Sequence, residues 1–159
     1  MRIAENYMLT HDIDLFCCVE RRYLIHLASN GSILPRFIDD RRVLRESQAI
    51  VREVPIMPEG ELQYNTPHIN ELRNLIDFDE NRYFESFRFF AQKGFYSFDY
   101  ECNEEGEGEY VLLLGPKEPR QYPWREFFVE TLPQVYLNEL NERDRYMFER
   151  IMNQIERIE

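Results

Sequence analysis

Residues 13–34, IDLFCCVERRYLIHLASNGSIL, carry the clearest signals for the fold of this chain. The apolar run over residues 13–19 predicts a mostly buried strand, and the alternation over residues 22–28 predicts a second strand after a charged turn. Asn30-Gly31 is typical of a tight type I′ turn, whose two central residues both need a positive φ. We expect Ile33-Leu34 to begin a short third strand, which the following proline confines to a sheet edge. Together these signals predict an N-terminal antiparallel β-meander.

A second hairpin and several amphipathic helices are expected downstream. Residues 79–93 place aromatic side chains three and four positions apart, so they predict a helix, and Gly94 suits the left-handed residue that ends it. Residues 95–101 and 109–115 predict two half-buried strands that form a hairpin. Shorter helices are predicted after Asp39-Asp40, Pro67 and Pro123, and a long C-terminal helix, opened by the capping box at residues 131–134, is predicted to run toward Ile158.

The order of the elements predicts the fold class. The alternation over residues 47–56 favours a fourth strand, and the alternative is a longer helix that reaches Arg52. Strands therefore come first, followed by helices, a hairpin and further helices, without regular β-α alternation. This order predicts an α+β fold rather than a doubly wound parallel sheet. We expect one globular domain over residues 1–159, in which a mostly antiparallel sheet packs against amphipathic helices.

The composition limits the class of protein. The chain has 159 residues, with 30 acidic against 19 basic side chains and a formal net charge of −11. An acidic chain repels phosphate backbones, so we do not expect a nucleic-acid partner. The sequence contains neither a run of about 18 apolar residues nor a secretory signal. We therefore expect a soluble, cytoplasmic protein without a membrane partner.

The charge is uneven along the chain. Residues 20–52 contain seven arginines against four acids, whereas residues 53–159 contain 11 basic against 23 acidic side chains. Arginine forms bidentate ion pairs and stacks on aromatic rings. We favour a fold in which the Arg-rich segment pairs with the acidic remainder. The alternative is a binding patch for an anionic ligand or partner.

Few residues are candidates for chemistry. Cys17, Cys18 and Cys102 lack zinc-ligand spacing, so they predict reduced thiols, and neither a metal nor a cofactor is expected. The cluster His11-Asp12-Ile13-Asp14 is the most metal-like, because three ligand types fall within four residues. A solvated entrance to the first strand explains this cluster more simply. His26 lies within the second predicted strand, where a hydrogen-bonded, half-buried histidine is a simpler interpretation than a catalytic base.

The acidic loop between the two strands of the second hairpin is a candidate binding site. Residues 101–109 contain five glutamates, of which Glu104, Glu105 and Glu107 are the candidate contacts for a basic partner. The EF-hand pattern fails here, because Leu112 stands where a bidentate glutamate is required. A hairpin tip held open by like-charge repulsion explains this loop more simply.

Trp124 and Arg125 form a second candidate binding site. Tryptophan and arginine are enriched in interface hot spots, so this pair is a candidate recognition anchor. A tryptophan packed in the core between helices is the simpler interpretation.

The function hypothesis follows from the charge and from the motifs that the chain lacks. The signatures of nucleotide-binding loops, α/β-hydrolases and zinc proteases do not occur in the sequence. We expect a non-catalytic protein-binding module, inhibitor-like, immunity-like or an adaptor, that acts on a basic partner. One alternative is a self-assembling structural component that forms homo-oligomers. The other is a metal-dependent or acid/base enzyme that uses the cluster of His11, Asp12 and Asp14, together with His26.

Overall fold

The computed structural model describes residues 1–75, 77–102, 105 and 107–158, and within them six strands form one mixed sheet. The strands are β1 (Asp14–Val19), β2 (Tyr23–Ala28), β3 (Leu62–Tyr64), β4 (Tyr96–Cys102), β5 (Gly108–Pro116) and β6 (Gln134–Val135). The α-helices are α1 (Glu5–Thr10), α2 (Arg41–Glu53), α3 (Thr66–Arg73), α4 (Glu80–Ala91), α5 (Arg125–Thr131) and α6 (Glu142–Ile158). Short 3-10 helices span Arg36–Ile38, Pro119–Gln121 and Leu137–Glu139. None of the helices in these residues has the length and apolar character needed to cross a membrane.

The strand order is β3-β5-β4-β2-β1-β6. The pairs β1–β2, β4–β5 and β3–β5 are antiparallel, whereas β2–β4 and β1–β6 are parallel. This arrangement confirms the predicted α+β class, the mostly antiparallel sheet and the second hairpin. The long C-terminal helix is also present as α6.

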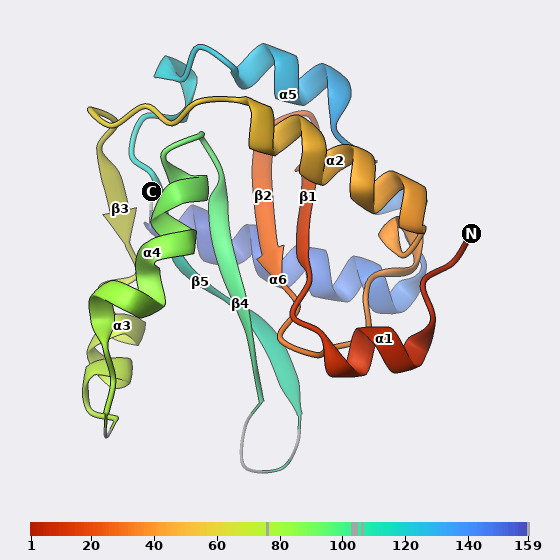
Figure 1. Ribbon diagram of the computed structural model, residues 1–159, viewed down its shortest axis with the longest axis horizontal. Coiled ribbons are helices and arrows are strands. Elements are labelled where there is room, and N and C mark those ends of the chain that lie inside the picture. Colours follow the sequence, from red (N-terminus) through yellow and green to blue (C-terminus); the bar gives the residue numbers. More distant parts are fainter. Residues whose placement is uncertain (76, 103–104, 106, 159) are drawn as a thin grey trace.

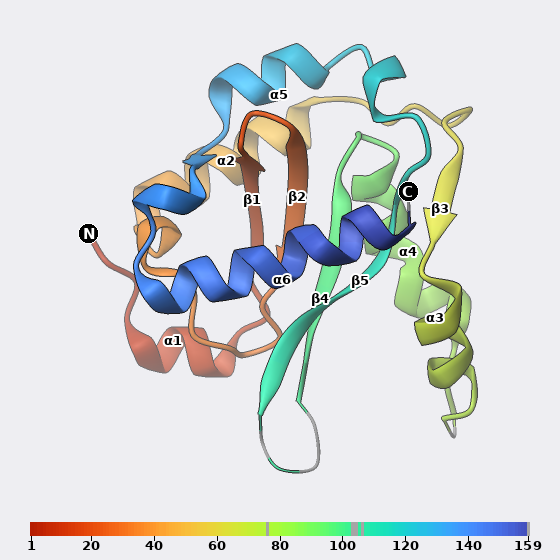
Figure 2. The same cartoon turned by 180° about the vertical axis from the view of Figure 1, so that it is seen from behind.

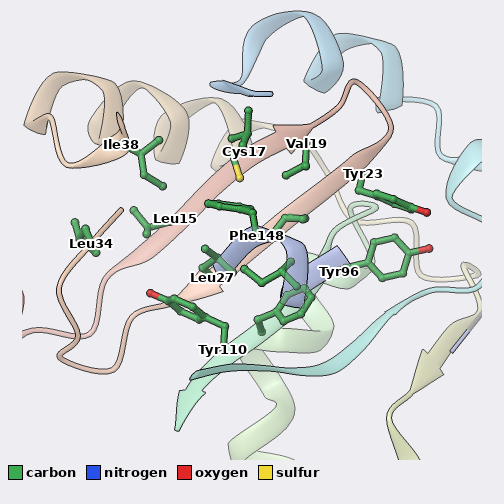
Figure 3. Close-up of a cluster of buried hydrophobic side chains, with 14 of the residues drawn as sticks. Leu15, Cys17, Val19, Tyr23, Leu27, Leu34, Ile38, Tyr96, Tyr110 and Phe148 are labelled. Atoms are coloured by element: carbon green, nitrogen blue, oxygen red, sulfur yellow. The ribbon is translucent and has the colours of Figure 1, made fainter. Parts of the chain in front are cut away.

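Helices cover both faces of the sheet. α6 crosses one face, and α2, α4 and α5 lie on the other (Figures 1 and 2). In β1, the side chains of Leu15, Cys17 and Val19 join a cluster with Phe148 of α6 (Figure 3). The intervening residues of β1 contact the opposite cluster, to which α2 and α5 contribute. Because β1 is buried on both faces, its sequence is a continuous apolar run.

Two tight turns shape the N-terminal third. Glu20 and Arg21 connect β1 to β2 and adopt φ values of 52° and 51°. Asn30-Gly31 also forms the predicted turn, with φ values of 45° and 79°. The third strand predicted at Ile33-Leu34 is wrong, however. Leu34 is buried in the cluster beneath α6, so the chain leaves the sheet after this turn instead of pairing with β2.

The preference for a strand over residues 47–56 is also wrong, because α2 continues to Glu53. Asp40 caps this helix, and its carboxylate accepts hydrogen bonds from the backbone N–H groups of the second and third helical residues at 2.9 and 3.2 Å. The helix buries Leu44, Ser47 and Val51, which lie three and four positions apart. The alternative of a helix that reaches Arg52 is therefore correct.

The start of the C-terminal helix differs from the prediction as well. Gln134-Val135 forms β6, which pairs in parallel with Cys18-Val19 at the edge of the sheet, so the expected capping box does not open a helix. α6 begins instead at Glu142, and the side-chain oxygen of Asn141 accepts a hydrogen bond from the backbone N–H of Asp144 at 2.8 Å. Asn141 thus caps the start of the helix.

Candidate functional site

A groove lies between the β4–β5 hairpin and α6. Its volume is about 680 Å³, and its walls include Tyr100, Gly108 and Tyr110 of the hairpin together with Arg143, Tyr146 and Arg150 of α6. Figure 2 shows α6 crossing β4 and β5 on this face, with the hairpin extending beyond the helix. The groove therefore lies where the hairpin projects from the body of the protein.

The two walls follow from the periodicities of a strand and a helix. In β4, Tyr96 and Phe98 belong to the cluster beneath α6, and Tyr100 continues their alternation on that face. In α6, residues 143, 146, 147, 150 and 154 fall three and four positions apart, so they share one face of the helix. The tyrosines of the hairpin therefore face the arginines and Tyr146 of α6 across the groove.

Tyr100 determines which residue can occupy position 108. Its ring packs against that of Tyr110, with centroids 5.1 Å apart in an edge arrangement. A Cβ atom placed on Gly108 would lie only 2.2 Å from the Tyr100 hydroxyl oxygen. Glycine therefore lets the ring lie over the strand.

The groove combines exposed aromatic and charged groups. The side chain of Tyr146 is 62% exposed, and the Arg150 guanidinium lies 5.6 Å from the centre of its ring. Arg150 also donates hydrogen bonds to the Tyr146 hydroxyl at 2.9 Å and to Glu109. Arg143 is exposed and forms no ion pair with any other described residue. Tyrosine, arginine and methionine are residue types that protein interfaces favour.

Side-chain amides form hydrogen bonds with part of the backbone edge of β5 that faces away from β4. β3 pairs only with Leu114, Gly115 and Pro116 of the nine-residue β5. Further along, the Gln154 amide donates to the Tyr110 carbonyl at 2.8 Å, and its oxygen accepts from the Leu112 N–H at 2.9 Å. The Asn65 amide donates to the Leu112 carbonyl at 2.8 Å. Two side-chain amides thus replace a neighbouring strand along residues 110–112.

A second polar cluster lies on the opposite face of the sheet. His26 contacts the Asp14 carboxylate through Nε2 at 2.7 Å and the Ser97 hydroxyl through Nδ1 at 3.1 Å. This order resembles that of a nucleophilic triad, but His26 and Ser97 are both fully buried. The Ser97 hydroxyl also donates to the Phe87 carbonyl at 3.4 Å. A substrate cannot reach a buried hydroxyl. These hydrogen bonds therefore stabilise the interior of the protein and do not form a reactive site.

Neighbouring titratable groups are paired in the same way. The Tyr83 hydroxyl donates to Asp99 at 2.6 Å. Burial, with smaller contributions from the nearby carboxylates of Asp12 and Glu101, raises the pKa of Asp99 to about 6. His68 contacts Glu101 at 2.8 Å, and this hydrogen bond raises the pKa of His68. These groups satisfy one another within the protein.

The side chains of His11, Asp12 and Asp14, the metal-like cluster of the sequence, contact three different parts of the protein. His11 stacks on Tyr7 at a centroid distance of 3.8 Å. Asp12 accepts a hydrogen bond from the Asn30 backbone N–H at 2.9 Å, and Asp14 contacts His26. In the part of the chain that the structure describes, no three His, Cys, Asp or Glu side chains are placed to hold a metal ion.

The predicted binding residues fall at two ends of the molecule. Glu104 lies outside the described residues, while Glu105 and Glu107 are exposed and Glu107 lines the groove. Trp124 packs partly buried against the cluster beneath α5, and Arg125 donates to the Arg22 carbonyl. In Figure 1, α5 lies at the end of the sheet opposite the hairpin tip. The structure therefore does not bring the two predicted sites together.

The Arg-rich segment, residues 20–52, contributes little to the groove. Arg21 pairs with Glu130 at 2.5 Å, whereas Arg42 pairs with Glu46 of its own helix at 2.9 Å. Among the described residues, Arg21 is the one arginine of this segment that forms an ion pair with residues 53–159.

Sequence reasoning did not identify Arg143, Tyr146 and Gln154 as site residues. The available signal was a tyrosine on the otherwise charged side of the C-terminal helix. Comparisons with protein-family models, with curated proteins and with solved structures found no match.

Proposed function

We propose that this protein is a non-catalytic protein-binding module, and that the groove between the β4–β5 hairpin and α6 binds a basic segment of its partner. The observation that carries the proposal is the open groove with Tyr146, which is 62% exposed, on one wall and Glu107 on the other. An exposed aromatic side chain beside charged groups is typical of a protein interface.

The openness of the groove favours a protein segment over a small molecule. Small-molecule sites enclose most of the surface of their ligand and are mainly apolar. Here Arg143, Tyr146 and Glu107 are all exposed, so one side of any occupant would stay in contact with solvent. A side chain or an extended segment of a larger partner fits this shape.

The charge favours a basic partner. The hairpin loop, residues 101–109, contains five glutamates, and residues 53–159 carry 23 acidic against 11 basic side chains. Glu109 pairs with Arg150, and the exposed side chains of Glu105 and Glu107 add negative potential near the end of the hairpin. Such a potential accelerates the encounter with a basic partner and discriminates against acidic ones.

The polar side chains on the opposite face of the sheet support the same proposal. His26, Tyr83 and His68 each contact a carboxylate of the protein itself. A catalytic group must instead reach a proton of the substrate. The titratable side chains therefore favour recognition over chemistry.

The proposal is tested by identifying a partner and measuring its dependence on the groove. The protein is immobilised, captured proteins from its native lysate are identified, and each is purified for direct binding measurements. We expect a basic partner whose affinity falls at least about tenfold with Tyr146→Ala and falls with added salt. Phe127→Ala is the matched control, because Phe127 is an exposed aromatic residue of α5 at the other end of the sheet.

Three results would overturn the proposal. The first is a partner whose affinity responds to Phe127→Ala but not to Tyr146→Ala. The second is a lysate that yields no groove-dependent partner. The third is capture of the protein itself alone, which would replace the proposal by self-assembly.

A further inference from the structure

We infer that the basic segment binds as an added β-strand along the outer edge of β5, at residues 108–110, next to Gln154. This inference rests on the proposed function and specifies how the groove binds its partner. β5 has nine residues, and β3 pairs only with the last three of them. A strand that extends beyond its neighbour presents free backbone groups to an incoming chain.

The direction of the backbone groups follows from the contacts of Gln154. In an antiparallel strand, alternate residues direct their N–H and C=O groups to the same side. The Tyr110 carbonyl and the Leu112 N–H both meet the Gln154 amide, so these residues point away from β4. Gly108, two positions earlier, has the same orientation. Among the described residues, no side chain hydrogen-bonds to its backbone groups or to the Tyr110 N–H.

Gln154 shows that this edge accepts a peptide group. The carboxamide of Gln154 presents its oxygen and one N–H on the same side, so it binds the Tyr110 carbonyl at 2.8 Å and the Leu112 N–H at 2.9 Å, as the N–H and C=O of one residue of a neighbouring strand would. An added strand would continue from this position toward the hairpin tip. It would lie inside the groove, because Gly108, Tyr110 and Tyr146 all line it.

The edge lacks the devices that usually prevent strand addition. Proteins protect exposed edges with proline, inward-pointing charges or lysine. Positions 108–110 hold Gly108, Glu109 and Tyr110, so proline and lysine are both absent there. The charges on the hairpin beside this edge are glutamates, which favour a basic strand and disfavour pairing between two copies of this acidic hairpin, while Arg143 and Arg150 of α6 line the other side of the groove.

The test uses two peptides of equal charge. The first is the acetylated, amidated hexapeptide Arg-Val-Lys-Val-Arg-Val, which can form a strand. The second has the same sequence with N-methyl groups on alternate residues, which removes the backbone donors of one edge. Each is titrated into the full-length protein, and binding is followed by NMR through chemical shifts and amide hydrogen exchange. The same peptide with glutamate in place of arginine and lysine is the charge control.

We expect the unmethylated basic peptide to bind at least about tenfold more tightly than the methylated one. The Tyr110 amide should exchange at least about tenfold more slowly when the peptide is bound, and the glutamate peptide should not bind. Equal binding of both basic peptides would overturn strand addition and leave a charge-based groove. Binding of neither would overturn the proposed function as well. Tight binding with unchanged exchange at Tyr110 would place the peptide elsewhere.

Discussion

Replacing Gln154 by alanine tests the interpretation of the β5 edge most directly. The substitution removes the donor to the Tyr110 carbonyl and the acceptor of the Leu112 N–H. Leu112 is fully buried, so its N–H would lose its partner in a site that water does not reach freely. An unsatisfied buried donor costs about 1–3 kcal/mol, so we expect the free energy of unfolding to fall by about that amount.

Urea unfolding followed by circular dichroism measures this loss. Asn153→Ala is the matched control, because Asn153 is exposed on the same helix, and we expect a change within about 0.5 kcal/mol there. A Gln154→Ala protein as stable as the wild type would show that the amide does not support the edge. The inference that the backbone N–H and C=O groups of Gly108 point away from β4 would then lose its support.

Three further substitutions have effects that the structure predicts. Gly115→Ala places a Cβ atom 2.3 Å from a ring carbon of the buried Tyr96, so urea unfolding should show a loss of about 1–3 kcal/mol. Lys93→Met removes the buried ammonium that donates to the Val51 carbonyl at 2.7 Å, near the end of α2, and should cost about 1–3 kcal/mol by the same assay. The pKa of Asp99 is raised to about 6, so its contribution to stability is full below about pH 4 and is lost as the pH rises through about 6. Asp99→Asn should therefore raise stability at pH 7, by at most about 3 kcal/mol, and weaken the pH dependence of unfolding between pH 4 and 7. A variant that is less stable than the wild type at pH 7 would contradict this.

Local signals predicted much of the fold. The hairpin of β4 and β5 follows from alternation over neighbouring residues, and α4 follows from the spacing of its aromatic side chains. Gly94 ends this helix region with a φ of 106°, as its sequence context indicates. Each of these features depends on contacts within about 20 residues of sequence, where a periodic pattern is informative.

The errors arise where a distant segment decides the structure. Gln134-Val135 becomes a strand because β1 offers an edge, although β1 lies more than 100 residues earlier in the chain. Residues 47–56 contain apolar side chains that fit either period, and the helix forms because Asp40 caps it and the cluster beneath α5 receives Val51. A pattern within one segment cannot show which neighbour it will meet.

The candidate site has the same dependence on distant contacts. The acidic hairpin loop was predicted from its glutamates, but the groove also needs α6, whose residues 143–154 reach the hairpin from a distance of about 40 positions in sequence. Tyr146 resembles an ordinary solvent-exposed side chain until the structure shows Arg150 and the hairpin beside it. Gln154 is one polar residue among many on a charged helix.

The two polar regions of the protein should respond differently to substitution, and this difference separates recognition from chemistry. His26 and Asp99 are buried and form hydrogen bonds with Asp14 and Tyr83, respectively, so changes there should alter stability and its pH dependence. Tyr146 and Glu107 are exposed, so changes there should alter binding while stability stays within about 0.5 kcal/mol. An active site would couple these two effects, because its titratable groups would have to face the ligand. A partner whose affinity followed the titration of Asp99 rather than the identity of residue 146 would therefore place the functional surface on the opposite face of the sheet.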